Sequence, residues 1–516
     1  MNRACFSENT NLHENIDMRV LPPERDKLSD LKETNYLRMK HLKYIIVLFL
    51  FGGLFSCELP DNVNPKMAAA VTGPAVFTMA EVQLIEQVNS LDQNQNISRL
   101  LAQYNAQTTY YGESQYNFYD RSLPDAMWQA LYRDVLLDLQ EAKRLADIDV
   151  TISSGVKINQ KTIIDILEVY TYHVLVDVNG NIPYSEALNG RENPTPEYDD
   201  AATIYSDLID RLTDDAVTLD NAYASYGVAD VMYHGDIDSW IRFANSLQLR
   251  LAMRLADVNP TLSQSTAEDA LARGVFTDQS QSAGQVYFGL TPHVNSIYGN
   301  IVEAGRRDFV AANTIVDTMN AVNDPRRPYY FSTFEGEYVG GSYGYSNVFE
   351  QCSSFSPQLL EADFPAILID YVEVKFLLAE AAARGYDVGG VSEESLYNEA
   401  VIESILAWGG TDAEAATYLA QPEIGYSKGS TAGDFRKKIG FQKWIALYNR
   451  GLEGWAEWRK FDTPIFNIPR RRTIDDIPMR MPYPYNENNL NLTNYTAAST
   501  AIGGDLVSTK LFWDIY

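Results

Sequence analysis

The sequence predicts a mainly α-helical protein in which tetratricopeptide-like helical hairpins form a scaffold and long irregular loops carry a ligand surface. Apolar residues recur at helical spacing through most of the 516-residue chain. Neighbouring helical segments have similar lengths, as in helical hairpins, although no exact repeat of fixed period is found. Long stretches rich in Tyr, Asn, Gly and Ser interrupt the helical pattern and supply the predicted loops.

The amino-terminal region has the features of a bacterial lipoprotein signal peptide. Lys40, His41 and Lys43 precede a short apolar run, and small residues lead from that run to Cys57. The run is too short to span a bilayer, and cleavage before Cys57 would leave its thiol to take up lipid. Attached acyl chains would then anchor the protein to a membrane. The alternative is an ordinary buried thiol behind a signal cut elsewhere.

These features divide the chain into four parts. Met39 directly precedes the basic lead, so we interpret it as the start of the precursor. The predicted parts are an upstream extension at 1–38, a signal peptide at 39–56, a flexible linker from the lipidated cysteine at 57–70, and a single helical domain at 71–516.

The predicted helices follow in order along this domain. Residues 79–104 are amphipathic, and a second helix starts near Pro124, whose missing N–H costs little in a first turn. A helix over 163–176 ends at the turn formed by Asn179, Gly180 and Asn181. Further helices are predicted at 198–219, 237–258, 310–322, 368–383, 396–408 and 435–458.

Charge and cysteine content exclude several classes of function. The chain has 69 acidic and 41 basic residues, a formal net charge of −28, which repels nucleic acid. Cys5 would be removed with the leader and Cys57 would take up lipid, so Cys352 has no intrachain partner in the mature chain. The sequence therefore predicts no disulfide framework and no cysteine-based zinc site.

Tyrosines mark the predicted ligand surface. The chain has 33 Tyr but only 7 Trp, and many of the tyrosines lie in the polar loops at 108–121, 284–307 and 329–355. Loops this long in a compact domain are usually functional or disordered, and the aromatic content argues against disorder. A phenol ring offers an apolar face and a hydroxyl, which suits sugars. The candidate binding residues are Tyr110, Tyr111, Tyr116, Tyr119, Arg121, Tyr298, Tyr338, Tyr343 and Tyr345, with burial against the scaffold as the alternative for any single ring.

Several short motifs follow one another along the mature chain. They are 177–187 (DVNGNIPYSEA), 240–247 (WIRFANSL), 250–254 (RLAMR), 371–385, 444–447 (WIAL), 455–459 (WAEWR) and 481–484 (MPYP). Each is weakly specific alone, but in this order, behind a lipoprotein signal, they resemble the SusD/RagB family of outer-membrane nutrient-binding lipoproteins over nearly all of the mature chain.

The resemblance implies a scaffold of four tetratricopeptide-like helix pairs and an outer-membrane location facing the cell exterior. It also implies a partner, a SusC-like TonB-dependent transporter, and an oligosaccharide ligand. Peptides are ligands in some branches of the family, so a peptide-capturing relative remains an alternative. Ligand contacts vary among members, so no contact residue is transferred by identity.

The shared motifs are expected to be structural. Trp444, Trp455 and Trp458 are predicted to lie in the core. Glu457 and Arg459 are predicted to satisfy each other or loop carbonyls.

No catalytic or metal site is predicted. The segment 340–344 matches the G-x-S-x-G pattern of hydrolases, but no histidine follows His293 to complete a triad. No spacing of acidic residues singles out a calcium site or a catalytic carboxylate pair, which leaves calcium binding open. The sequence therefore predicts a binding protein without enzymatic activity or cofactor. A lipid-anchored glycoside hydrolase and a ligand-free scaffold are the remaining alternatives.

Overall fold

The computed structural model describes residues 71–118, 120–426, 434–472, 474 and 476–516. The predictions for 1–38, 39–56 and 57–70, including Cys57, lie outside the described residues, as does the candidate Tyr119. Residues Val71–Tyr516 form one compact unit.

Helices dominate this unit, so the mainly α-helical fold class is confirmed. The amino-terminal helices are α2 (Gly73–Asn89), α3 (Ser98–Leu101), α4 (Leu123–Gln129), the π-helical η2 (Ala130–Leu136), α5 (Leu137–Ile148), α6 (Ser154–Asn179), α7 (Ala201–Thr218), α8 (Ile237–Arg254) and α9 (Pro260–Arg273). The later helices are α10 (Ser296–Tyr298), α11 (Asn313–Ala321), α12 (Arg327–Tyr330), α13 (Tyr371–Ala383), α14 (Glu393–Ala407), α15 (Asp412–Leu419), α16 (Asp434–Ala446), α17 (Gly451–Phe461), α18 (Tyr485–Leu490) and α19 (Leu492–Ala501).

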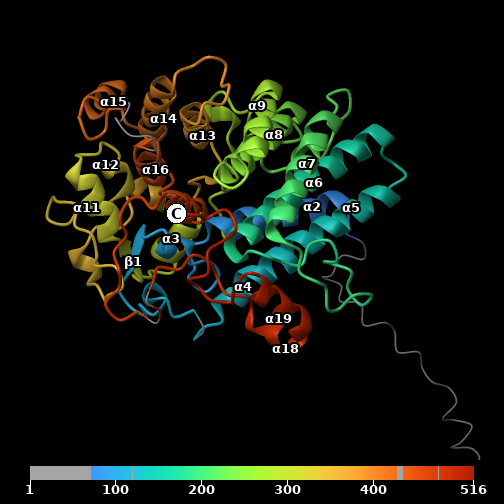
Figure 1. The fold of residues 1–516 in the computed structure, drawn as a ribbon, viewed down its shortest axis with the longest axis horizontal. Helices are drawn as coiled ribbons and strands as arrows, with labels where there is room; N and C mark the ends of the chain where they lie inside the picture. Colours follow the sequence, from blue (N-terminus) through green and yellow to red (C-terminus); the bar gives the residue numbers. More distant parts are fainter. Residues whose placement is uncertain (1–70, 119, 427–433, 473, 475) are drawn as a thin grey trace, which may run out of the picture. The chain divides into compact units, whose positions relative to one another are not determined.

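Successive helices pack on one another as hairpins. Contacts join α5 to α6, α6 to α7, α7 to α8 and α8 to α9, and Figure 1 shows α6 to α9 lying side by side in teal to green. A second group joins α13 to α14 and α16, and α16 to α17. This arrangement is the helical-hairpin scaffold that the sequence predicts.

Helix starts are fixed by side-chain caps. Asp200, Asp236 and Asp370 each precede a helix and accept a hydrogen bond from a backbone N–H in its first turn. Thr411 and Glu414 form a reciprocal capping box at the start of α15. Such caps satisfy N–H groups that have no partner within the helix.

Two short antiparallel sheets attach the loops to this scaffold. In the first, β1 (Asn105–Gln107) pairs with β3 (Phe309–Ala311), with Ala106 opposite Val310. In the second, β2 (Ala283–Gln285) pairs with β4 (Ala366–Ile369). Both sheets therefore begin or end the irregular segments that the sequence predicts as loops.

The structure corrects several predicted helix boundaries. The predicted helix over 79–104 is α2 and α3 with a turn between them, and that over 435–458 is α16 and α17. The predicted helices over 310–322 and 368–383 each begin with strand residues, those of β3 and β4. The helix predicted at 163–176 lies within α6, which ends at Asn179 before Gly180, whose φ is +88°.

Candidate functional site

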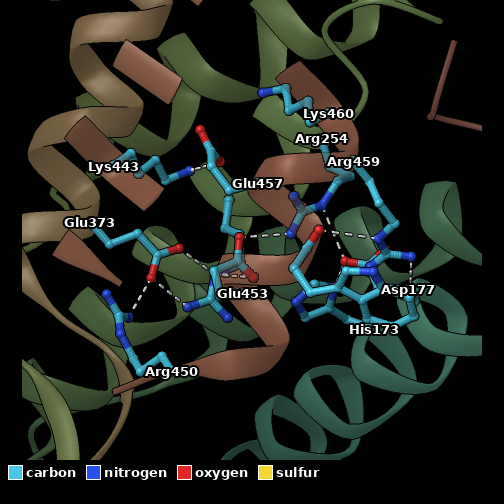
Figure 2. Close-up of polar contacts among 12 residues, drawn as sticks. His173, Asp177, Arg254, Glu373, Lys443, Arg450, Glu453, Glu457, Arg459 and Lys460 are labelled. Atoms are coloured by element: carbon cyan, nitrogen blue, oxygen red, sulfur yellow. Dashed lines mark hydrogen bonds and ion pairs between the residues drawn. The ribbon is translucent and has the colours of Figure 1, made fainter. Parts of the chain in front are cut away.

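Charged side chains buried inside the scaffold form a connected network. Glu373 accepts hydrogen bonds from both Arg250, at 2.7 and 2.8 Å, and Arg450, at 2.5 Å. Arg254 bridges Glu453 at 2.7 Å and Asp177 at 3.1 Å. Figure 2 shows Glu453 near the centre of this network, between the Glu373 side and the Asp177 side.

Ion pairing decides the protonation state at the centre of the network. Burial raises the pKa of the Glu453 carboxyl, but the guanidinium groups of Arg254 and Arg250 outweigh burial and hold that pKa well below its ordinary value. Burial lowers the pKa of Lys460 to about 8, although the Glu380 carboxylate opposes this change. The charges in this network are paired with one another, which is the pattern of a structural network rather than of a catalytic site.

The network uses the motif residues that the sequence assigns to the scaffold. Trp444, Trp455 and Trp458 are buried, as predicted. Arg459 donates at 2.8 Å to the backbone carbonyl of Met479, which confirms the predicted pairing with a loop carbonyl, and at 2.8 Å to that of Asp177 in the last turn of α6. Glu457 instead pairs with Lys443 at 2.7 Å, so the alternative of a Glu457–Arg459 pair is wrong.

The candidate binding tyrosines do not share one environment. Tyr110, Tyr345 and Arg121 are exposed, with 68% of Tyr110 accessible. Tyr111, Tyr298 and Tyr338 are half-buried.

Two candidates belong to the core, which corrects the prediction for them. Tyr116 and Tyr343 are only 2% and 3% exposed, and their ring centroids lie 6.4 Å apart. The Tyr343 hydroxyl donates to the carbonyl of Leu100 at 2.8 Å. Both rings therefore stabilise the loops instead of facing a ligand.

Direct hydrogen bonds bring the loops together. The Asn347 amide donates to the carbonyl of Gln107, and the Ser346 hydroxyl donates to that of Thr108, both at 2.8 Å. The Gln115 amide donates to the Gly344 carbonyl at 2.8 Å, and Thr108 also bonds to the backbone of Arg307. We call residues 108–118, 121, 286–307 and 338–352 the loop face.

Tyr110 is presented on this face by a buried polar residue. The Gln107 amide nitrogen donates to the Tyr110 carbonyl at 3.0 Å and to the Glu113 carboxylate at 2.8 Å. The Arg121 guanidinium lies 5.3 Å from the centroid of the Tyr110 ring and pairs with Glu113 at 3.2 Å. The structure thus joins two predicted residues, Tyr110 and Arg121, in a cation–π pair on the surface.

The loop face also contains exposed apolar residues that the sequence reasoning missed. Val286, Phe288 and Leu290 are 67%, 70% and 75% exposed. In contrast, Gln285, which precedes Val286, and Tyr287, which lies between Val286 and Phe288, are buried. The alternation of exposed and buried side chains continues that of β2, in which successive side chains point to opposite sides. A search for period-two alternation in this segment could have found Phe288; a search for tyrosines could not.

Among the described residues, no group of three His, Cys, Asp or Glu side chains is placed to hold a metal ion. No helix among the residues that the structure describes combines the length and apolar character needed to cross a membrane.

Comparison with the sequence profiles of known families shows to which family this chain is related. The sequence profile of the SusD-like family described as "Starch-binding associating with outer membrane" matches residues 65–484. The chain belongs to the SusD-like family. The resemblance inferred from the motifs is therefore confirmed, and the family consists of surface proteins associated with the outer membrane. A search of curated protein sequences found no match.

Solved structures of SusD-like proteins have the same fold. A chitin-binding SusD homologue from Flavobacterium johnsoniae is 24% identical, with 85% of this chain and 98% of that chain covered and a TM-score of 0.75. A SusD homologue from Bacteroides uniformis is 25% identical, with 86% and 99% covered and a TM-score of 0.74. SusD-like proteins are binding proteins.

Proposed function

We propose that the chain is a cell-surface lipoprotein that binds oligosaccharide on its loop face and delivers it to a partner SusC-like TonB-dependent transporter. The observation that carries the proposal is the exposure of Tyr110, Phe288 and Tyr345 on a SusD-like scaffold. The starch-binding description of the family and the chitin-binding relative support a glycan as the ligand.

The chemistry of the loop face suits sugar rings. Exposed aromatic faces can cover the C–H surfaces of a pyranose, while phenol, guanidinium and amide groups hydrogen-bond to its hydroxyls. Binding here breaks no covalent bond. Affinity for one oligosaccharide can be modest, because tethering beside a transporter raises the effective concentration of bound ligand to about the millimolar range.

Removing the exposed rings is expected to weaken glycan binding. Tyr110→Ala and Phe288→Ala should each raise the Kd for maltoheptaose or chitohexaose about 5- to 30-fold, equivalent to about 1–2 kcal/mol of lost contact. Isothermal titration calorimetry on the full chain measures this. Tyr485→Ala is the matched control, since Tyr485 is 64% exposed but lies on α18, outside the loop face, and its loss should leave the Kd unchanged.

Other outcomes of the same titration identify the alternatives. Binding of peptides in place of glycans would indicate a peptide-capturing relative, and cleavage of the glycan during titration would indicate a hydrolase. If neither class of ligand binds, or if Tyr110→Ala and Phe288→Ala bind glycans like the wild type, the proposed loop-face function is wrong.

The proposed anchor is tested separately. Cys57→Ser should release the mature protein from the membrane fraction and abolish incorporation of labelled palmitate, because no other residue is proposed to take lipid. A membrane-bound, palmitate-labelled Cys57→Ser protein would contradict the proposed anchor.

The proposed partner is tested by affinity purification. The wild-type chain should recover a TonB-dependent transporter.

A further inference from the structure

A cavity of about 160 Å³ opens beside the second sheet, outside the loop face. Its walls come from the segment before and within β4, from the end of α14 and from the connection between α16 and α17. Phe364 and Trp408 line it, and their rings pack on each other with centroids 6.0 Å apart and planes inclined at 29°. Ile367 and Ala446 complete an apolar lining.

The size of the cavity fits one six-membered ring. An engineered protein cavity of about 150 Å³ holds benzene, so a space of 160 Å³ has room for a single ring of that kind. Larger ligands would have to extend out of the opening.

The lining residues have unused hydrogen-bonding groups of both kinds. Within the described part of the chain, the Asp370 carboxylate uses only Oδ1, which accepts from Arg450 and from the backbone of Glu373, and leaves Oδ2 without a partner. The Asn449 side chain accepts from Arg99 through Oδ1, and its NH₂ group makes no hydrogen bond to described residues.

Two further groups complete this set. Gln358 donates to the Tyr329 carbonyl at 2.9 Å and has a free amide oxygen, and the Trp408 indole N–H has no partner among the described residues. Two donors and two acceptors beside two aromatic rings match the needs of a polyhydroxylated ring, whose hydroxyls both donate and accept.

The charges in the lining favour a neutral ligand. Arg450 is committed to Glu373 at 2.5 Å and Asp370 at 2.9 Å, so it offers no free cation to a carboxylate or sulfate. An anionic ligand would also meet the Asp370 carboxylate, and an unpaired charge is costly to bury.

The cavity wall is continuous with the loop face. The Asn295 side chain donates to the carbonyl of Leu359 at 2.7 Å, and the Asn295 N–H donates to that of Ala362 at 2.9 Å. A Cβ atom at Gly289 would lie 3.9 Å from the Cβ of Asp363, next to the exposed Phe288. The segment before Phe364 therefore lies against the loop that carries Phe288.

We propose that this cavity binds one neutral pyranose ring beside the Phe364 and Trp408 pair. The ring is either a free monosaccharide or the terminal residue of an oligosaccharide held on the loop face. Only the second case rests on the proposed function, so the experiment measures monosaccharide and oligosaccharide binding separately.

Filling the cavity tests the proposal without removing a structural contact. Ala407 lines the cavity and is exposed, so Ala407→Trp should occupy the space for a ring. Ala413→Trp on the exposed side of α15 is the matched control. Saturation-transfer NMR on the full chain, with methyl glucoside and N-acetylglucosamine as probes, should show binding weakened at least tenfold in Ala407→Trp and in Trp408→Ala, and unchanged in Ala413→Trp.

The outcomes separate this proposal from the loop-face function. Unchanged monosaccharide binding in Ala407→Trp overturns the cavity site, even if Trp408→Ala fails to fold through loss of its packing on Tyr330. Equal binding of glucuronate and methyl glucoside by the wild type overturns the neutral assignment. Weaker maltoheptaose or chitohexaose binding in Ala407→Trp identifies the chain end as ligand, and loss of monosaccharide alone identifies a free sugar. Tyr110→Ala should weaken the binding of oligosaccharides and leave the binding of monosaccharides unchanged.

Discussion

Replacing Glu373 with alanine is expected to destabilise the folded chain by about 3–5 kcal/mol. Glu373 is fully buried and holds the guanidinium groups of Arg250 and Arg450 through three hydrogen bonds. Without this carboxylate, two cations would remain in the interior short of a partner. The free energy of unfolding falls mainly because buried guanidinium groups are left unpaired, and less because the attraction between Glu373 and the arginines is lost.

Urea unfolding of the full chain measures this change. Glu373→Gln should also be strongly destabilising, because it removes the negative charge between two guanidinium groups and replaces one acceptor oxygen by an NH₂ donor. The control is Glu141→Ala, which breaks an exposed pair with Arg144 on α5 and should cost less than about 1 kcal/mol. Equal, small effects of Glu373→Ala and Glu141→Ala would show that the buried network contributes little to stability.

Acidification from pH 6.5 to 4 should cost about 3 kcal/mol of stability through His173 alone. Burial lowers the pKa of His173 from 6.5 to about 4, although Asp177, whose carboxylate lies 3.3 Å away, opposes this. In this range the unfolded chain binds a proton that the folded chain does not. The contribution of His173 to the free energy of unfolding is therefore fully present above pH 6.5 and is lost as the pH falls towards 4.

A matched variant isolates this contribution from that of the many carboxylates. His173→Gln removes the titrating group, so its free energy of unfolding should change less between pH 7 and pH 4 than that of the wild type, by about 3 kcal/mol. Urea unfolding at each pH provides the comparison. Parallel pH profiles for the two proteins would mean that His173 does not titrate differently on folding.

The helices of the scaffold were largely predictable from the spacing of apolar residues, but the points at which neighbouring helices are interrupted were not. Apolar spacing placed the helix at 163–176 correctly, and the scaffold interpretation of the shared motifs predicted the buried tryptophans. The same spacing runs across the turn between α16 and α17, so it predicted one helix there. The break is tied to a tertiary contact, because a Cβ atom at Gly451 would lie 2.5 Å from the backbone nitrogen of Arg99. The spacing of apolar residues in one segment cannot predict such a contact with a residue far away in the sequence.

The candidate site was predictable as a region but not residue by residue. Loop composition located the region, yet a polar, glycine-rich setting did not reveal that Tyr116 and Tyr343 turn inward. Their orientation depends on contacts with residues far along the chain, such as Leu100. Phe288 was overlooked because ring type, and not strand alternation, guided the search.

Hydrogen–deuterium exchange of the full chain with and without bound oligosaccharide tests most directly whether the loop face binds the ligand. Bound ligand should slow exchange in 108–118 and 286–303 of the loop face and leave exchange in α7, α8 and α9 unchanged. Protection confined to those helices, with none on the loop face, would contradict the claim that this surface binds the ligand.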